Sequence, residues 1–116
     1  MSNFIIYHNP RCSKSRQTLK LLQDKNKNPK IILYLENTPT HEELVLLLRK
    51  LEMTPRNLLR KGEKEYKNYN LQDSSITDNE VINIMTKCPK LIERPIVVRG
   101  NKAIIGRPPE NINELI

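Results

Sequence analysis

A chain of 116 residues can bury one hydrophobic core but not two independent ones, so a single domain covering residues 1–116 is expected. Hydrophobic residues make up 37% of the chain, and the longest uninterrupted apolar runs, such as residues 44–48, are too short to cross a bilayer, which excludes a membrane span. The net charge of +7 favours anionic partners in general, without choosing among nucleic acid, a membrane surface and small anions.

The first 35 residues predict a strand, a helix and a second strand. Residues 3–8 and 31–35 are rich in β-branched and aromatic side chains, as strands are. Between them, Leu19 and Leu22 are spaced for one buried helix face. Two apolar strands joined through a helix favour a right-handed parallel βαβ unit. Cys12 then lies in the turn between the first strand and the helix.

The middle of the chain predicts a block of helices, introduced by two capping boxes at residues 40–43 and 77–80. Apolar residues recur at helical spacing after each box, which predicts a helix over 41–51 and another that ends before Pro89. A short helix is expected after Pro55, and residues 70–76 are expected to form a loop. The spacing of the second helix places Cys88 on its apolar face, so Cys88 is interpreted as a core residue.

The last third of the chain predicts a hairpin and a final helix. Residues 95–98 and 103–105 are strand-like and flank a turn at 99–101, while Pro108 and Pro109 begin the helix. The order of elements predicts an α/β fold with a mixed four-stranded sheet, flanking helices and an inserted helical block at about 38–90.

Cys12 is the strongest candidate for chemistry. A cysteine at the start of a helix feels the positive end of the helix dipole and free N–H groups, and Arg11, Lys14 and Arg16 add charge in the sequence nearby. Thiols in such settings have pKa values of roughly 3.5–7.5. The N–H groups of the turn from Cys12 to Ser15 also suit an anion. Nucleophile and oxyanion would therefore share one pocket.

Several other cysteine chemistries are excluded by spacing. Ser15 stands where a redox CxxC motif has its second cysteine, and Arg16 comes too soon for the CxxxxxR loop of phosphatases. The two cysteines do not make a disulfide framework. The N-terminus lacks the features of a secretion signal, so a cytoplasmic location is expected.

Five blocks of sequence resemble the glutaredoxin-coupled arsenate reductase family: IYHNPRCSKSR at 6–16, LYLE at 33–36, LLRK at 58–61, RPIVV at 94–98 and IGRPPE at 105–110. The resemblance implies a thioredoxin-like fold in which Pro95 is cis. It implies that Cys12 is the nucleophile and that His8 tunes its thiol. The oxyanion and its covalent adducts would be held by Arg60, Arg94 and Arg107, with Ser15 in the substrate-binding turn.

The same resemblance implies a reaction. The Cys12 thiolate attacks arsenate, glutathione displaces a further oxygen, and glutaredoxin reduces the adduct to release arsenite. Arginines neutralise the charge, so no metal and no bound cofactor are expected. Glutathione is a co-substrate and glutaredoxin a protein partner, and a monomer is the default expectation.

Two alternatives stay open, and a third is disfavoured. A member of the same family could use its thiol on another oxyanion or on a mixed disulfide. A related branch contains redox regulators that bind RNA polymerase, although Ser15 in place of the second cysteine argues against a disulfide switch. A nucleic-acid-binding module is not expected, because the chain lacks aromatic stacking residues among its cations.

Overall fold

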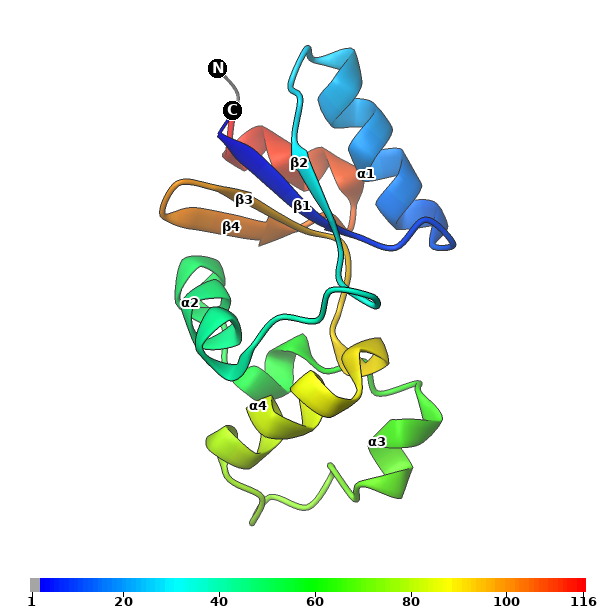
Figure 1. Ribbon diagram of the computed structural model, residues 1–116, viewed down its shortest axis with the longest axis vertical. Helices are drawn as coiled ribbons and strands as arrows, with labels where there is room; N and C mark the ends of the chain where they lie inside the picture. Colours follow the sequence, from blue (N-terminus) through cyan, green and yellow to red (C-terminus); the bar gives the residue numbers. More distant parts are fainter. Residues whose placement is uncertain (1–2) are drawn as a thin grey trace. The chain divides into compact units, whose positions relative to one another are not determined.

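The computed structural model describes residues 3–116 and shows an α/β protein with two compact units (Figure 1). The first unit consists of the chain up to Asn37 together with Arg94–Ile116, and the second is Thr38–Glu93. The helical insertion expected at about 38–90 falls within the second unit. In the part of the chain described, no helix has the length and apolar character needed to cross a bilayer.

The first unit contains the four-stranded mixed sheet that the sequence predicts. Its strands, in chain order, are β1 (Phe4–His8), β2 (Lys30–Leu33), β3 (Ile96–Arg99) and β4 (Lys102–Ile105). They lie in the order β2-β1-β3-β4, with β1 parallel to β2 and antiparallel to β3, and β3 antiparallel to β4. The predicted βαβ unit and hairpin are therefore confirmed.

Two helical segments pack together in this unit: α1 (Ser13–Asp24) and the 3₁₀ segment η3 (Pro109–Glu114), which lie side by side in Figure 1. Leu22 of α1 is fully buried, as its spacing predicts. It belongs to a core cluster with side chains from the sheet and the C-terminal segment, namely Phe4, Ile6, Val97, Ile112 and Leu115. The last helix, predicted to begin at Pro108 and Pro109, is therefore present, and it is a 3₁₀ helix.

The strand β2 is shorter than its apolar run. Its pairing with β1 ends where Leu33 faces His8, and the Leu33 carbonyl then accepts hydrogen bonds from the N–H groups of Glu36 and Asn37 at 2.9 and 2.8 Å. Tyr34 and Leu35 consequently lie in a turn. The prediction of a strand over 31–35 is therefore wrong at its C-terminal end, because the apolar residues continue beyond the last residue of β1 with which β2 can pair.

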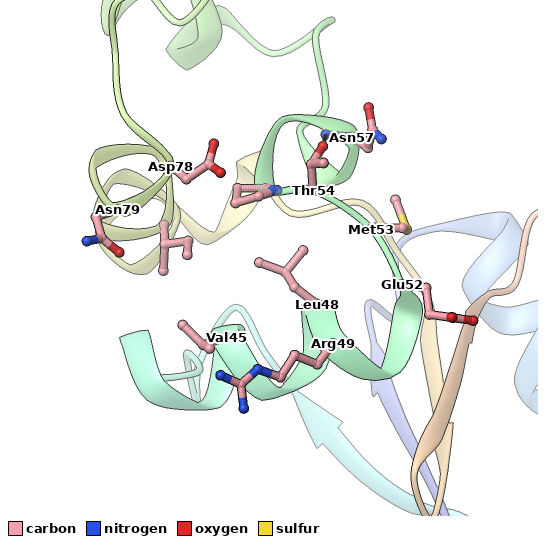
Figure 2. A pocket seen from close by; sticks show the side chains of 11 residues that line it. Val45, Leu48, Arg49, Glu52, Met53, Thr54, Asn57, Asp78 and Asn79 are labelled. Atoms are coloured by element: carbon pink, nitrogen blue, oxygen red, sulfur yellow. Dashed lines mark hydrogen bonds between the residues drawn. The ribbon is translucent and has the colours of Figure 1, made fainter.

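The second unit is helical and starts both of its long helices as the sequence predicts. In α2 (His41–Leu51) and α4 (Asp78–Lys87) the capping threonine accepts from the third backbone N–H, and the glutamate at that position returns the bond, so both capping boxes are confirmed. Figure 2 shows an open groove of about 550 Å³ between these helices, lined by side chains that include Leu48, Arg49 and Asp78. None of its lining residues is a predicted site residue.

The irregular part of the second unit is organised by Arg56. A 3₁₀ turn, η1 (Pro55–Leu58), occupies the place of the short helix expected after Pro55, and α3 (Lys64–Asn68) was not predicted. The Arg56 guanidinium donates hydrogen bonds to three carbonyls of the following loop, those of Leu71, Asp73 and Ile76. The predicted loop at 70–76 is confirmed, and this arginine satisfies its main chain.

Cys88 is not a core residue. Helix α4 ends at Lys87, and Cys88 has φ −130° and ψ 76°, because a residue before proline is sterically disfavoured in the helical conformation. A short 3₁₀ turn, η2 (Pro89–Leu91), follows. The half-buried thiol donates to the Tyr69 hydroxyl at 3.6 Å. The prediction of a core position for Cys88 assumed that the helix continues through residue 88, and it is wrong because the helix ends one residue earlier.

Candidate active site

Cys12 is presented by a short turn between β1 and α1. The Cys12 N–H donates to the Asn9 carbonyl at 3.0 Å, and the Asn9 side chain accepts from the Arg11 N–H at 3.0 Å. The Arg16 guanidinium, one helical turn further on, donates to the Pro10 carbonyl at 2.9 Å. These bonds make Cys12 the N-cap residue of α1, with φ −95° and ψ 122°.

The surroundings of Cys12 favour its thiolate. Burial alone would raise the pKa of the Cys12 thiol, but the backbone N–H of Ser15, the Arg94 guanidinium, the backbone N–H of Lys14 and the Arg107 guanidinium together lower it below its ordinary value. The first turn of α1 contains no acidic residue that would weaken the positive end of the helix. Cys12, of which only 7% is exposed, therefore carries a thiol suited to nucleophilic attack.

Two of the three predicted arginines act on this thiol, Arg94 through its charge and Arg107 through its charge and a direct contact. Arg107 Nη1 donates to Cys12 Sγ at 3.8 Å and to the Arg94 carbonyl at 3.2 Å, so a single guanidinium joins the Cys12 thiol to the segment just before β3. Each arginine is followed by a proline through a cis peptide bond, Arg94–Pro95 and Arg107–Pro108. Charge nearby in the sequence pointed to Arg11, Lys14 and Arg16, whereas the cations that lower the pKa of Cys12 are Arg94 and Arg107, which the family resemblance had named.

His8 and Ser15 form a buried pair behind the turn. Ser15 Oγ lies 2.6 Å from His8 Nδ1 and accepts the Asn9 N–H at 3.0 Å. A buried hydroxyl needs an acceptor for its own proton, and His8 Nδ1 is the one within reach, so the neutral ring carries its proton on Nε2. Burial lowers the pKa of His8, and the charge of Arg16 lowers it further. The Ser15 hydroxyl is therefore used within the protein, while its backbone N–H acts on the sulphur.

Arg60 belongs to the second unit. Its Nη1 lies 3.2 Å from Glu63 Oε2 and its Nε lies 3.8 Å from Glu93 Oε1, with the side chain 25% exposed. Its backbone N–H donates to the Leu91 carbonyl at 2.8 Å. The guanidinium therefore already has two carboxylate neighbours, and its part in holding an oxyanion stays a prediction.

Two residues of the site were not singled out from the sequence: Gly106 and Thr18. A Cβ on Gly106 would lie 2.6 Å from Thr18 Oγ1 and 2.9 Å from Pro95 Cγ, so no larger residue fits. The Thr18 hydroxyl lies 3.1 Å from the Gly106 carbonyl, and the Gly106 N–H donates to the Pro95 carbonyl at 2.9 Å. This packing holds the main chain that carries Arg107. The signals were a threonine on the buried face of α1 and a glycine directly before a candidate arginine.

The arrangement suits nucleophilic attack on an oxyanion. A thiol with a lowered pKa, two guanidiniums and the N–H groups of a helix start can hold a tetrahedral anion and neutralise the charge of an adduct. Within residues 3–116 no group of three or more His, Cys, Asp and Glu side chains is placed to bind a metal ion.

Comparison with known proteins gives consistent matches over the whole described fold. Residues 7–115 match the model of the ArsC family. The chain is 50% identical over 112 residues to the "uncharacterized protein YfgD" of Escherichia coli strain K12, covering 96% of this chain and 94% of that one. It is 41% identical over 116 residues to an arsenate reductase of Escherichia coli, covering 100% of this chain and 82% of that one. A solved structure described as arsenate reductase from Vibrio cholerae superimposes with a TM-score of 0.95 at 46% identity, covering 97% of each chain.

Proposed function

Because the chain belongs to the ArsC family, we propose that it is an arsenate reductase in which the Cys12 thiolate attacks the oxyanion. The family and the α/β thioredoxin-like fold expected from the sequence are confirmed by the same matches. The observation that carries the proposal is the contact between Arg107 Nη1 and Cys12 Sγ at 3.8 Å, at the acid-free start of a helix.

The first step follows from the charges around Cys12. Arg94 and Arg107 attract the arsenate anion and screen its charge from the approaching thiolate. The Cys12 sulphur then forms a bond to arsenic, and one arsenic–oxygen bond breaks, with the oxygen leaving as water after taking up protons. The N–H groups of Lys14 and Ser15, which stabilise the thiolate, lie where they can bind the remaining oxygens.

The electrons come from outside the chain. The unit that holds Cys12 has no second cysteine, and Cys88 in the other unit donates to Tyr69. Glutathione displaces a second oxygen from the arsenic, again as water, and a thiol of glutaredoxin attacks the glutathione sulphur. That attack forms a mixed disulfide and leaves two electrons on arsenic, which is released as arsenite after water cleaves the bond to Cys12. In total, arsenate and two thiols give arsenite, one disulfide and one water.

The remaining predicted residues have supporting roles in this scheme. His8 holds the Ser15 hydroxyl, so it tunes the thiol by fixing the helix turn whose N–H groups act on Cys12. The part of Arg60 in binding the oxyanion is proposed on the family resemblance alone, since its guanidinium lies beside Glu63 and Glu93. No bound cofactor is required, and the protein would act as a monomer. Glutathione and glutaredoxin are kept reduced in the cytoplasm, so the reaction belongs there.

The proposal is tested by following NADPH oxidation with arsenate, glutathione, glutaredoxin and glutathione reductase. We expect arsenate-dependent turnover in the native chain and in Cys88→Ser, and none in Cys12→Ser. Turnover that survives in Cys12→Ser would contradict the assignment of the nucleophile. A reactive Cys12 without arsenate turnover would instead favour the same thiol chemistry on another oxyanion or on a mixed disulfide.

A further inference from the structure

A small pocket lies on the β2 side of the catalytic turn. Its volume is about 270 Å³, and its walls come from residues 8–11, which precede Cys12, and from Leu33, Leu35 and Glu36 at and after the end of β2. Neither Arg94 nor Arg107 lines it. The two guanidiniums thus define one side of the turn, where the oxyanion is proposed to bind. The pocket lies on another side of the turn, to which the proposed function assigns no ligand.

The buried ring of His8 offers a polar group to this pocket. The side chain is only 6% exposed, yet it is part of the pocket wall. Its Nδ1 is held by Ser15, and no residue in the described chain takes its Nε2. Because the neutral ring carries its proton on Nε2, the pocket contains a fixed hydrogen-bond donor.

Two exposed side chains of opposite charge complete the pocket. Arg11 comes from the catalytic turn and Glu36 from the turn after β2, and within residues 3–116 neither forms a salt bridge. Between them lie apolar walls from Leu33 and Leu35, the latter 38% exposed. A matching ligand would carry both a carboxylate and an ammonium group on a short, partly apolar chain.

We propose that this pocket binds glutathione, the thiol co-substrate, an inference that rests on the proposed function. The Glu36 carboxylate pairs with the ammonium group of the tripeptide, while Arg11 and the His8 Nε2–H bind its carboxylate or carbonyl oxygens. The Cα atoms of Arg11 and Cys12 are about 3.8 Å apart, as in any trans peptide, so a tripeptide anchored here can direct its central thiol to the Cys12 adduct.

This placement separates the two substrates. The oxyanion uses Arg94 and Arg107, whereas glutathione uses Arg11, Glu36 and His8, so the two anionic molecules do not compete for the same cations. The attacking thiol is also held beside its target, which lowers the entropic cost of the second displacement.

The test is a titration of the whole ¹⁵N-labelled chain with S-methylglutathione, whose blocked sulphur cannot react. We expect NMR shifts to concentrate at Arg11, Leu35 and Glu36. Binding should weaken about tenfold in Arg11→Gln and in Glu36→Gln, because each loses a charge-assisted contact. Glu42→Gln, which neutralises an exposed glutamate of α2, is the matched control and should bind as the native chain does.

Absence of binding, shifts centred on Arg94 and Gly106 instead, or unchanged affinity in both variants would overturn the inference. Because the probe is unreactive, binding is measured without arsenate chemistry. Binding at this pocket without arsenate turnover would keep the pocket and reject the proposed function. Arsenate turnover without binding at this pocket would keep the proposed function and reject the pocket as the glutathione site.

Discussion

The two cysteines occupy opposite ends of helices and show how one side chain acquires two roles. Cys12 precedes the first turn of α1, where N–H groups point outward and Arg107 lies 3.8 Å from the sulphur. Cys88 follows the last turn of α4, where carbonyls are exposed, and its thiol donates to Tyr69. A thiolate gains from the first setting and not from the second. Position at a helix end, more than burial, distinguishes the thiol proposed as the nucleophile from the thiol that donates to Tyr69.

The sharpest way to break this comparison is to measure alkylation of each thiol alone. In Cys88→Ser, iodoacetamide at pH 6 should modify Cys12 about tenfold faster, or more, in the folded chain than in urea. The sign follows from the lowered pKa, because the thiolate then persists as the pH falls below the range of an ordinary thiol. In Cys12→Ser, folding should slow the alkylation of Cys88, because its half-buried thiol donates to the Tyr69 hydroxyl. Equal rates for Cys12 in folded and unfolded chains would refute the comparison.

A second test displaces Arg107, one of the groups that lower the pKa of Cys12, by changing a residue that does not contact the thiol. Gly106→Ala places a methyl group against Thr18 and Pro95, which displaces the main chain before Arg107. The pKa of Cys12 should rise, and its alkylation at pH 6 should slow by about five- to tenfold. Overpacking should also cost about 1–3 kcal/mol in the free energy of unfolding, measured with urea.

The control for this substitution is Gly62→Ala, because a Cβ on Gly62 meets nothing within 4 Å. It should leave the pH profile of Cys12 alkylation unchanged. If Gly106→Ala lowers stability but keeps the native profile, Gly106 contributes to packing only and does not position Arg107.

The smallest effect is expected from adding a negative charge to the first turn of α1, which would weaken the positive end of that helix. Ser13→Asp introduces a carboxylate into a first turn that has no acid. It should stabilise the helix by about 0.3–1 kcal/mol, yet raise the pKa of Cys12 and slow alkylation at pH 6 by about two- to fivefold. Ser13→Asn, similar in size and neutral, is the control. Faster alkylation in Ser13→Asp would contradict the role given to the helix dipole.

Local patterns in the sequence predicted what depends on neighbours along the chain. The two capping boxes, the hairpin and the place of Cys12 at a strand-to-helix turn are examples, since each rests on a few adjacent residues. Cys88 shows the limit of the same reasoning: its spacing from Val81 is helical, but Pro89 acts on the residue before it.

Contacts between segments far apart in the sequence were harder to predict. The sequence named Arg94 and Arg107 through the family resemblance, but their relation to Cys12 depends on the register of β3 and β4. Charge near Cys12 in the sequence suggested Arg16, whose guanidinium in fact holds the Pro10 carbonyl. The close packing of Gly106 against Thr18 involves residues 88 positions apart, and no periodicity reports such a pair.

Part of what activates Cys12 comes from the main chain. The N–H groups of Lys14 and Ser15 lower the pKa of the thiol, and every amino acid except proline carries that donor. The exposed side chain at position 14 can therefore vary over evolution without removing this part of the site. A proline there would remove the donor while remaining acceptable in a first helical turn. This part of the reactivity of Cys12 therefore depends on the backbone conformation of the turn, and it places little constraint on the residue type at position 14.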